Sequence, residues 1–545
     1  MSGKDGRNAQ GQLSNLPHCS SLGPRGAARR SARGMLHDFL TQSALRSPGV
    51  QAISAGRATL TYGRLEHDAT AVAHSLRASG VQAGDRVIVL SPNTITAAIG
   101  FWAVVMCGAV VVMISPLTPA HKLAWALKDA DAAALITDES LVGVAVAADV
   151  TKLRAVIVAG PPSALAELSH LVHSVTLEEA VAAGSHADTD LPARARADLA
   201  ALVYTSGSSG EPKAVMVTHG NVDAAATTIC GYLGLTCRDV LLCALPLSFD
   251  YGLYQMIMSV KVGARLVLER SFDLPGQILN AVVREGVTVF PGVPTMFAML
   301  ARLPSLERWD LASVRTITSS GSTLASEQVA WLRGAFPRAQ IFSMYGLTEC
   351  KRCTYLPPAD LERKPGSVGV AIPGNEIWLV DAEDRVVAAG EVGELVVRGP
   401  TVMAGYWHRP EETDRRLRPG PDPGEVVLYT GDLCRLDDDG YLYFVSRMDD
   451  VIKSRGQKVA PAEVEAALRS SPGVLEAAVV GRPDEVLGQA IHAFVLVNDR
   501  SEVTPAVLRA ACRERLEPFK VPQAIEIVDS LPRTANGKVE KTALA

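Results

Sequence analysis

Apolar and polar positions alternate along the first half of the chain in a way that predicts strands and helices in turn. From Asp38 to about Arg270, short runs of aliphatic and β-branched residues are separated by longer stretches with helical spacing. The runs that predict strands lie at 86–90, 133–137, 155–158 and 264–269, with two more at 287–290 and 316–318. This alternation is typical of parallel sheets covered by helices.

Beyond about Pro373 the pattern changes. Strand-like runs become shorter and are separated by Gly and Asp turns, as at 394–398 and 441–444. A last segment of mixed helix and strand character begins near Asp450. No internal repeat is visible in the sequence.

One stretch, from Ser91 to His121, carries no charge and is long enough to cross a bilayer. Gly108 divides it into an Ala-rich half of helical character and a β-branched half from Ala109 to Ile114. This division favours a buried helix followed by a buried parallel strand over a membrane span.

Composition and charge exclude several classes of protein. The 545 residues include 53 Lys and Arg against 58 Asp and Glu, a formal net charge of −5, with 48% hydrophobic and 20% charged residues. These values exclude a disordered or collagen-like chain, and no basic excess indicates a nucleic-acid partner. The length corresponds to about three or four folding units.

The nine cysteines are odd in number and scattered from Cys19 to Cys512. This usage suits a reducing compartment better than a disulfide scaffold, so we expect a cytoplasmic protein. Cys350 and Cys353 lie close together, but no second pair at zinc spacing accompanies them, and no metal site is expected there.

Residues 1–33 are rich in Ser, Gly, Ala and Arg and lack an apolar run, so residues 1–34 are expected to form a disordered extension. The composition is similar to that of a transit peptide, but no apolar core for secretion is present. We favour an upstream start codon, because Met35 opens the first amphipathic segment.

The strongest local motif is a run of glycine and hydroxyl residues that follows a predicted strand at 201–204. Backbone N–H groups at the glycines, side-chain hydroxyls and one lysine are the ingredients of a polyphosphate cradle. The run matches neither GxxxxGK[ST] nor GxGxxG, nor the hydrolase elbow GxSxG. Taken alone, it could also be a flexible surface turn. The residues expected to hold phosphate are Thr205, Ser206, Gly207, Ser208, Ser209, Gly210 and Lys213.

With four other motifs, this run resembles the adenylate-forming superfamily of acyl-CoA synthetases, nonribosomal-peptide adenylation domains and luciferases. The other motifs lie at 345–349, 429–432, 446–456 and 531–538, in the order and at the spacing of the family. The resemblance covers about residue 36 to the C-terminus. It implies an α/β fold with a large N-terminal domain of two helix-covered β-sheets plus a small distorted β-barrel, at 35–448. A small mobile α+β C-terminal domain, at 449–545, is expected to follow.

The resemblance implies that the protein activates a carboxylic acid with ATP. Enzymes of this family form an acyl-adenylate and pyrophosphate, and then usually transfer the acyl group to a thiol. Two anions must be brought together, so positioning and electrostatic stabilisation carry most of the catalysis.

The matching motifs assign nucleotide-binding roles to four residues. Tyr345 is expected to stack on the adenine, and Gly321 to allow close backbone approach along the base and the acyl pocket. Asp432 would accept hydrogen bonds from both ribose hydroxyls. Arg447 would reach the ribose or a phosphate.

The catalytic residues that the resemblance implies are Lys538, Thr348 and Glu349. Thr348 would donate to the α-phosphate, and Glu349 would bind Mg²⁺. Lys538, presented by an Asn-Gly turn, would bridge the carboxylate and the α-phosphate. Asp449 matches the family's hinge, about which the C-terminal domain would rotate to bring 453–456 to the site for thioester formation.

The segment 245–254 falls where the family builds its acyl pocket. Asp250 resembles the aspartate that amino-acid-activating members use to bind an ammonium group, and a buried aspartate needs a cationic partner. The alternative is an N-cap or Asx-turn aspartate at the start of a helix.

Lys351 and Arg352 follow Glu349 directly and are open to two interpretations. They could form a solvated face, or they could turn inward near Ser320 and hold a second carboxylate. Together with Asp250, the inward arrangement is similar to stand-alone β-amino-acid adenylating enzymes that load carrier proteins in polyketide macrolactam pathways. It implies a substrate of the aspartate type.

The thiol acceptor is left open between CoA and the phosphopantetheine of an acyl or peptidyl carrier protein. Basic residues of the C-terminal domain would suit either one: Lys453, Arg455, Lys458 and Lys520. The alternative enzyme is an AMP-forming acyl-CoA ligase for a fatty or aromatic acid. A luciferase-like oxygenase is disfavoured, because the sequence shows no sign of a second reaction after adenylation. A catalytically silent binding protein is also disfavoured, because it would not need the full set of catalytic residues.

Overall fold

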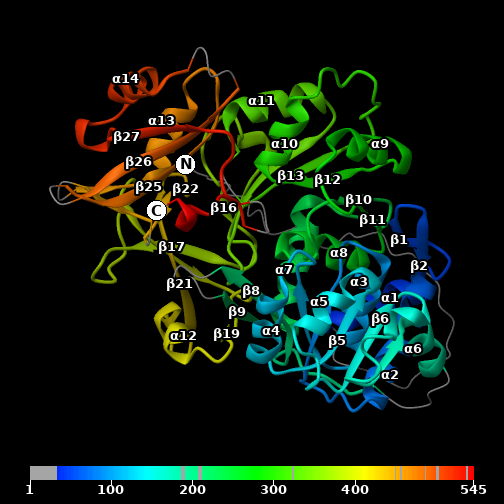
Figure 1. Cartoon of the computed structure of the whole chain (residues 1–545). Helices are drawn as coiled ribbons and strands as arrows, with labels where there is room; N and C mark the ends of the chain where they lie inside the picture. The colour runs from blue at the N-terminus through cyan, green and yellow to red at the C-terminus, as the bar shows by residue number, and fades with distance from the viewer. Residues whose placement is uncertain are drawn as a thin grey trace, which may run out of the picture. The chain divides into compact units, whose positions relative to one another are not determined.

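The computed structural model describes residues 34–185, 191–206, 212–321, 324–448, 450–454, 457–484, 487–498, 503–534 and 538–544. Four sheets organise this part of the chain (Figure 1).

The first sheet has eight strands in the order β19-β9-β8-β4-β3-β5-β6-β7. The strands from β8 to β7 are parallel, whereas β9 and β19 are antiparallel at one edge. Their bounds are β3 Arg86–Leu90, β4 Val110–Ile114, β5 Ala132–Asp138, β6 Ala155–Ala159, β7 Ser174–Thr176, β8 Leu199–Ser206, β9 Pro212–Thr218 and β19 Gly405–Tyr406.

Helices cover both faces of this sheet, as alternate residues of β3 demonstrate. Val87 and Val89 pack in one core with α2 (Tyr62–Ala78), α3 (Ile95–Met106) and α6 (Leu177–Gly184). Ile88 and Leu90 pack in another core with α4 (Ala120–Asp129) and α5 (Val142–Ala147). Residues two apart on a strand share a face, so β3 is buried on both sides.

The second sheet has nine strands in the order β16-β15-β14-β13-β12-β10-β11-β1-β2. From β14 to β1 the strands are parallel. Their bounds are β1 Gln51–Ala55, β2 Ala58–Thr61, β10 Val240–Cys243, β11 Arg265–Leu268, β12 Val289–Gly292, β13 Thr316–Ser319, β14 Gln340–Tyr345, β15 Thr354–Leu356 and β16 Val370–Ala371.

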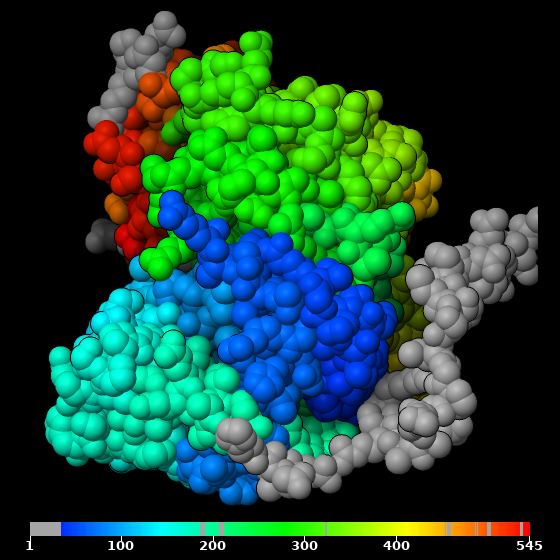
Figure 2. Space-filling model, turned by 90° about the vertical axis from the view of Figure 1, so that its right-hand side faces the viewer, coloured from blue at the N-terminus to red at the C-terminus, as the bar shows by residue number. Residues whose placement is uncertain are grey.

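The helices of the second sheet share a core with the first. Residues of α1 (Leu36–Arg46), α7 (His219–Leu233) and α8 (Asp250–Val262) belong to the same buried cluster as α3. Three further helices, α9 (Pro275–Glu285), α10 (Pro294–Ala301) and α11 (Ser326–Ala335), follow in the part of the chain that is coloured green in Figure 2.

A third, antiparallel sheet follows in the order β17-β18-β21-β20, with β22 paired to β21. Its strands are β17 Glu376–Val380, β18 Val392–Arg398, β20 Leu417–Pro419, β21 Val426–Leu436 and β22 Leu442–Arg447, with α12 Pro410–Arg416 between β19 and β20.

The last part of the chain forms a small α/β unit with a core of its own. Its sheet has the order β24-β23-β26-β25, with β27 paired to β26. The elements are β23 Ile452–Ser454, β24 Gln457–Val459, α13 Pro461–Arg469, β25 Val474–Asp484, β26 Gly488–Val497, α14 Pro505–Arg515 and β27 Ala524–Val528. The predicted fold class, α/β with helix-covered sheets and a small C-terminal unit, is confirmed.

The uncharged stretch at 91–121 divides at Gly108 as predicted, into α3 and β4, and Gly108 has a φ of 78°. Within the described residues, no helix is long and apolar enough to span a membrane. Two details differ from the prediction. The strand expected at 287–290 is β12, two residues later, and Asp432 lies inside the long strand β21 rather than ahead of a strand.

Candidate active site

Four neighbouring parallel strands of the second sheet, β10, β12, β13 and β14, end at one edge. Ligands of open α/β sheets bind at this edge, where polar loop residues gather. Ser320 and Gly321 follow β13 directly, and Thr348 and Glu349 lie in the loop after β14. The fold thus brings the predicted site residues Ser320 and Gly321 to the same edge as the motif 345–349.

Lys538 reaches the same edge from the C-terminal unit. A Cβ atom added at Gly321 would lie 4.0 Å from the Lys538 Cε and 3.6 Å from the Val293 Cγ1. Gly321 has a φ of 96°, in the region that favours glycine. The lysine predicted to bridge carboxylate and phosphate therefore lies over the loop predicted to border the base and the acyl pocket.

Tyr345, Asp432 and Arg447 form one hydrogen-bonded and ion-paired group. The Tyr345 hydroxyl donates to Asp432 Oδ2, and the Arg447 Nε lies 3.3 Å from Asp432 Oδ1. Burial raises the pKa of Asp432, although Arg447 and the Tyr345 hydroxyl favour its charged form. Asp432 Oδ1 accepts no hydrogen bond from the described residues, so this carboxylate keeps capacity for hydroxyl donors.

Glu349 is held at two points by the segment that contains β19. The Tyr406 hydroxyl donates to Glu349 Oε1 at 2.7 Å, and the Met403 N–H donates to the Glu349 carbonyl oxygen at 2.7 Å. No group of three His, Cys, Asp or Glu side chains in the described ranges could hold a metal ion. A single carboxylate fits Mg²⁺ in nucleotide sites, where phosphate oxygens and waters complete the coordination.

Lys213 lies on β9, opposite Thr205 of β8. Its ammonium forms an ion pair with Glu412 and lies 5.8 Å from the centre of the Tyr406 ring. The Thr205 hydroxyl donates to the Lys213 carbonyl oxygen at 3.4 Å. Ser206 is the last residue of β8. Gly207, Ser208, Ser209 and Gly210, the side chain of Ser206 and the hinge residue Asp449 lie outside the described residues.

Three charged side chains of the predicted acyl pocket are buried. Relative exposure is 7% for Asp250, 3% for Lys351 and 5% for Arg352. Asp250 is the first residue of α8 and follows the N-cap Phe249, whose side chain makes no capping bond, so the alternative of an N-cap aspartate is wrong. The alternative of a solvated face for Lys351 and Arg352 is also wrong, because both turn inward.

The cations of this pocket are incompletely paired. The Lys351 Nζ and the Arg352 Nε have no hydrogen-bond partner in the described part of the chain. Burial lowers the pKa of Lys351, and the Asp250 and Glu349 carboxylates only partly oppose this shift. The Arg352 guanidinium lies 4.6 Å from the centre of the Tyr251 ring and donates to the Lys351 carbonyl oxygen at 2.7 Å. Ser320, also buried, follows β13 at the same edge.

A strained turn presents Lys351. Its φ is 63°, and the Arg352 N–H donates to the Cys350 carbonyl oxygen at 2.8 Å, which closes a three-residue turn. The turn brings the Cys350 and Cys353 sulfur atoms to 2.7 Å from each other. Gly346 packs beneath it, since a Cβ there would lie 2.4 Å from the Lys351 carbonyl oxygen. A positive φ at a non-glycine residue strains the backbone, and strained residues of this kind are typical of functional sites.

Sequence reasoning missed Tyr406 and Glu412, which contact Glu349 and Lys213. The stretch 405–412 contains no recognisable catalytic or binding motif. The partner residues, Glu349 and Lys213, lie more than 50 residues away in the chain. Only the pairing of β19 with β9 reveals their proximity.

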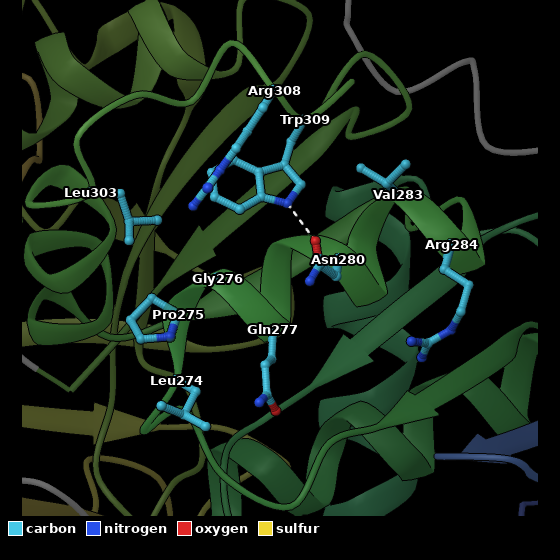
Figure 3. A pocket seen from close by; sticks show the side chains of 10 residues that line it. All are labelled: Leu274, Pro275, Gly276, Gln277, Asn280, Val283, Arg284, Leu303, Arg308 and Trp309. Carbon is cyan, nitrogen blue, oxygen red and sulfur yellow. Dashed lines mark hydrogen bonds between the residues drawn. The ribbon is translucent and has the colours of Figure 1, made fainter.

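A surface groove of about 700 Å³ lies apart from these residues, along α9 and the segment after α10 (Figure 3). The Trp309 Nε1 donates to Asn280 at 2.7 Å, and the Arg308 guanidinium lies 3.9 Å from the centre of the Trp309 ring. None of the predicted site residues lines this groove.

Comparison with known proteins agrees with this geometry. The model of the AMP-binding enzyme family matches residues 40–407, and that of the AMP-binding enzyme C-terminal domain matches residues 463–538. A long-chain-fatty-acid–CoA ligase of Bacillus subtilis (strain 168) is 32% identical, with 93% of this chain and 94% of that protein covered. A feruloyl-CoA synthase of an Amycolatopsis species is 36% identical, with 93% and 97% covered.

Solved structures extend the likeness to three dimensions. An o-succinylbenzoate CoA synthetase of Bacillus subtilis, in complex with ATP and magnesium ion, is 29% identical with a TM-score of 0.77, and 93% of this chain and 98% of that chain are covered. The chain belongs to the AMP-binding enzyme family, within the adenylate-forming superfamily. It is accordingly an AMP-forming acid–thiol ligase.

Proposed function

We propose that this enzyme activates an amino or β-amino acid of the aspartate type with ATP and delivers it to the phosphopantetheine thiol of a carrier protein. The observation that carries the substrate class is the buried set of Asp250, Lys351 and Arg352. A buried charge without a partner costs several kcal/mol, so opposite charges on a bound ligand stabilise such a set.

The charges of this set match one ammonium and one carboxylate that does not react. Asp250 would pair with the ammonium group. Lys351 and Arg352 would hold the second carboxylate through charge-assisted bonds, with Ser320 as an additional donor. An alkyl chain would leave the Lys351 Nζ and the Arg352 Nε buried without a partner in the described part of the chain, which argues against a fatty acid.

The nucleotide would be held by the groups described above. Tyr345 would pack on the adenine, Asp432 would accept the ribose hydroxyls, and Arg447 would contact ribose or phosphate. Thr205 to Gly210 and Lys213 would cradle the β- and γ-phosphates, while Thr348 would donate to the α-phosphate.

Glu349 would hold Mg²⁺, which would neutralise charge on the phosphates when bound. Lys538 would bridge the carboxylate of the acid and the α-phosphate, the two anions that must meet. The proximity of Lys538 to Gly321 supports this role. Rotation about Asp449 would withdraw Lys538 once the adenylate has formed, and would bring 453–456 to the site.

The carrier protein is proposed as the acceptor because the substrate resembles those of carrier-loading enzymes. The second candidate is free CoA, which the relatives' names favour. Lys520 is already paired with Glu463 and Glu517, each at 2.8 Å, and is a poor candidate for CoA phosphates. Arg455 and the side chains of Lys453 and Lys458 lie outside the described residues.

The proposal is tested by ATP–pyrophosphate exchange against a panel of acids that differ by one group. The reference substrate of the panel is an amino dicarboxylic acid. It is compared with the same acid without its amine, with the same acid without its second carboxylate, and with a fatty acid. We expect kcat/KM to fall at least tenfold when either charged group is removed. The Asp250→Ala variant should lose amino-acid-dependent exchange while ATP binding is retained.

The control variant is Asp310→Ala, which removes an exposed aspartate. Equal exchange with a fatty acid and with the amino dicarboxylic acid would contradict the proposed substrate class. The acceptor is tested separately, by thioester formation with CoA and with a phosphopantetheinylated carrier protein. Efficient turnover with CoA alone would favour the second candidate.

A further inference from the structure

The segment 403–412 joins two parts of the site that are distant in the sequence. Tyr406 pairs with Val215 on β9, close to Lys213 of the phosphate loop. The Met403 N–H, three residues earlier, donates to the Glu349 carbonyl oxygen at 2.7 Å. One short segment therefore contacts both the strand after the phosphate loop and the backbone of Glu349, the residue assigned to the metal.

Tyr406 is the side chain at the centre of this junction. Its hydroxyl donates to Glu349 Oε1 at 2.7 Å, and its own N–H donates to the Thr413 hydroxyl at 2.9 Å. The ring is buried. A carboxylate oxygen only accepts hydrogen bonds, so the Tyr406 hydroxyl is the donor in this contact.

The other face of the junction carries Lys213. Its ammonium forms an ion pair with Glu412 and lies 5.8 Å from the centre of the Tyr406 ring. An ammonium at this distance is attracted by the face of an aromatic ring. The ring thus contacts the phosphate-loop lysine, while the hydroxyl contacts Glu349.

We propose that Tyr406 is a positioning residue that fixes the Glu349 carboxylate for a divalent cation. The proposal rests on the metal role of Glu349 in the proposed function. A hydrogen bond to Oε1 selects one orientation of the carboxylate and leaves Oε2 free to coordinate an ion. Without the phenol hydroxyl, the carboxylate would have to be ordered by the ion itself, and the ion would bind more weakly.

The two parts of the side chain can be separated by substitution. Tyr406→Phe removes the hydroxyl and keeps the ring beside Lys213, whereas Glu349→Gln removes the charge that the hydroxyl orients. Tyr62→Phe is the matched control, because the buried Tyr62 hydroxyl donates to the Ser259 carbonyl oxygen at 3.1 Å, in the core and away from the site.

The experiment measures the Mg²⁺ requirement of the full-length enzyme in two ways. The first is the half-saturating Mg²⁺ concentration in ATP–pyrophosphate exchange. The second needs no turnover: the Mg²⁺ concentration at the midpoint of thermal stabilisation with a non-hydrolysable ATP analogue. We expect Tyr406→Phe to raise both values about five- to tenfold, with kcat at saturating Mg²⁺ within about twofold of the parent, and Tyr62→Phe to change neither.

The double variant shows whether Tyr406 acts through Glu349. In the Glu349→Gln background, Tyr406→Phe should raise the Mg²⁺ requirement no further, because the carboxylate that it orients is gone. An unchanged requirement in Tyr406→Phe alone, or the same increase in both backgrounds, would overturn the positioning role. If Glu349→Gln itself leaves the requirement unchanged, the metal role of Glu349 fails, and the inference fails with it.

Discussion

Asp432 on β21 and Arg447 on β22 are directly paired across the antiparallel ladder, with the Arg447 Nε 3.3 Å from Asp432 Oδ1. The register of two neighbouring strands thus places a carboxylate beside a cation at the edge where Tyr345 donates to the same carboxylate. The pairing of the two backbones therefore determines that the Asp432 and Arg447 side chains lie next to each other.

Replacing Asp432 with Asn should separate stability from nucleotide binding. Burial raises the pKa of Asp432, so the folded state favours the protonated acid, and the group contributes less stability as pH rises through that pKa. Asp432→Asn should therefore leave the Tm at pH 8 unchanged or higher. The KM for ATP should rise at least tenfold, a loss of about 1.4 kcal/mol in binding.

Asp437→Asn is the matched control for this prediction. Asp437 follows β21 and pairs with Lys364 at 2.8 Å. Its loss should lower the Tm and leave the KM for ATP unchanged. A fall in Tm for Asp432→Asn, without a change in KM, would instead indicate a purely structural aspartate.

Removing the Lys538 ammonium should abolish the first half-reaction. We expect Lys538→Ala to lower acid-dependent ATP–pyrophosphate exchange at least 100-fold, because the carboxylate and the α-phosphate lose their common counter-charge. Thioester formation from a supplied acyl-adenylate should persist. Lys541→Ala, three residues later, removes a lysine that pairs with Glu465 at 2.7 Å and should retain exchange. Full exchange by Lys538→Ala would refute its catalytic role.

Replacing Lys351 with Met should exchange specificity for stability. Burial lowers the pKa of Lys351, so folding acts against the charge of this ammonium group and the charge costs stability. Lys351→Met should raise the Tm and should raise the KM for an amino dicarboxylic acid at least tenfold. The KM for the same acid without its second carboxylate should stay unchanged. Lys128→Met, at an exposed lysine of α4, should change none of these values. A uniform loss with all acids would contradict a role in recognising the second carboxylate.

Acid should destabilise the core through His219. The Leu36 N–H donates to His219 Nδ1 at 3.2 Å, so this histidine is neutral, and burial lowers its pKa to about 4. The neighbouring His37 and Arg194 shift the pKa in the same direction. The stabilisation is present above pH 6.5 and is lost as pH falls towards 4, by up to about 3 kcal/mol.

His219→Gln should flatten this dependence, as measured by urea unfolding between pH 7 and pH 4.5. The exposed His121→Gln serves as the control and should retain the parent slope. An unchanged slope in His219→Gln would assign the acid sensitivity to other groups.

The sequence predicted much of this fold, because its signals were local. The β3 run at 86–90 alternates between two cores, and Gly108 marks the end of α3, so each could be read without its neighbours. The inward turn of Lys351 and Arg352 was left open, since it depends on a positive φ at a lysine and on the room that Gly346 provides. Tyr406 was missed because its partner, Glu349, lies 57 positions away.

The three-residue turn at Lys351 has a consequence for engineering the enzyme. Glu349, assigned to catalysis, and Lys351, assigned to specificity, stand two positions apart on one closed loop whose backbone is fixed by Gly346 and by the Cys350–Arg352 hydrogen bond. Under the proposed roles, selectivity and catalysis therefore both depend on the backbone of this one loop. A chimera that imports a new acid preference will keep its turnover number only if residues 345–353 are exchanged as one piece.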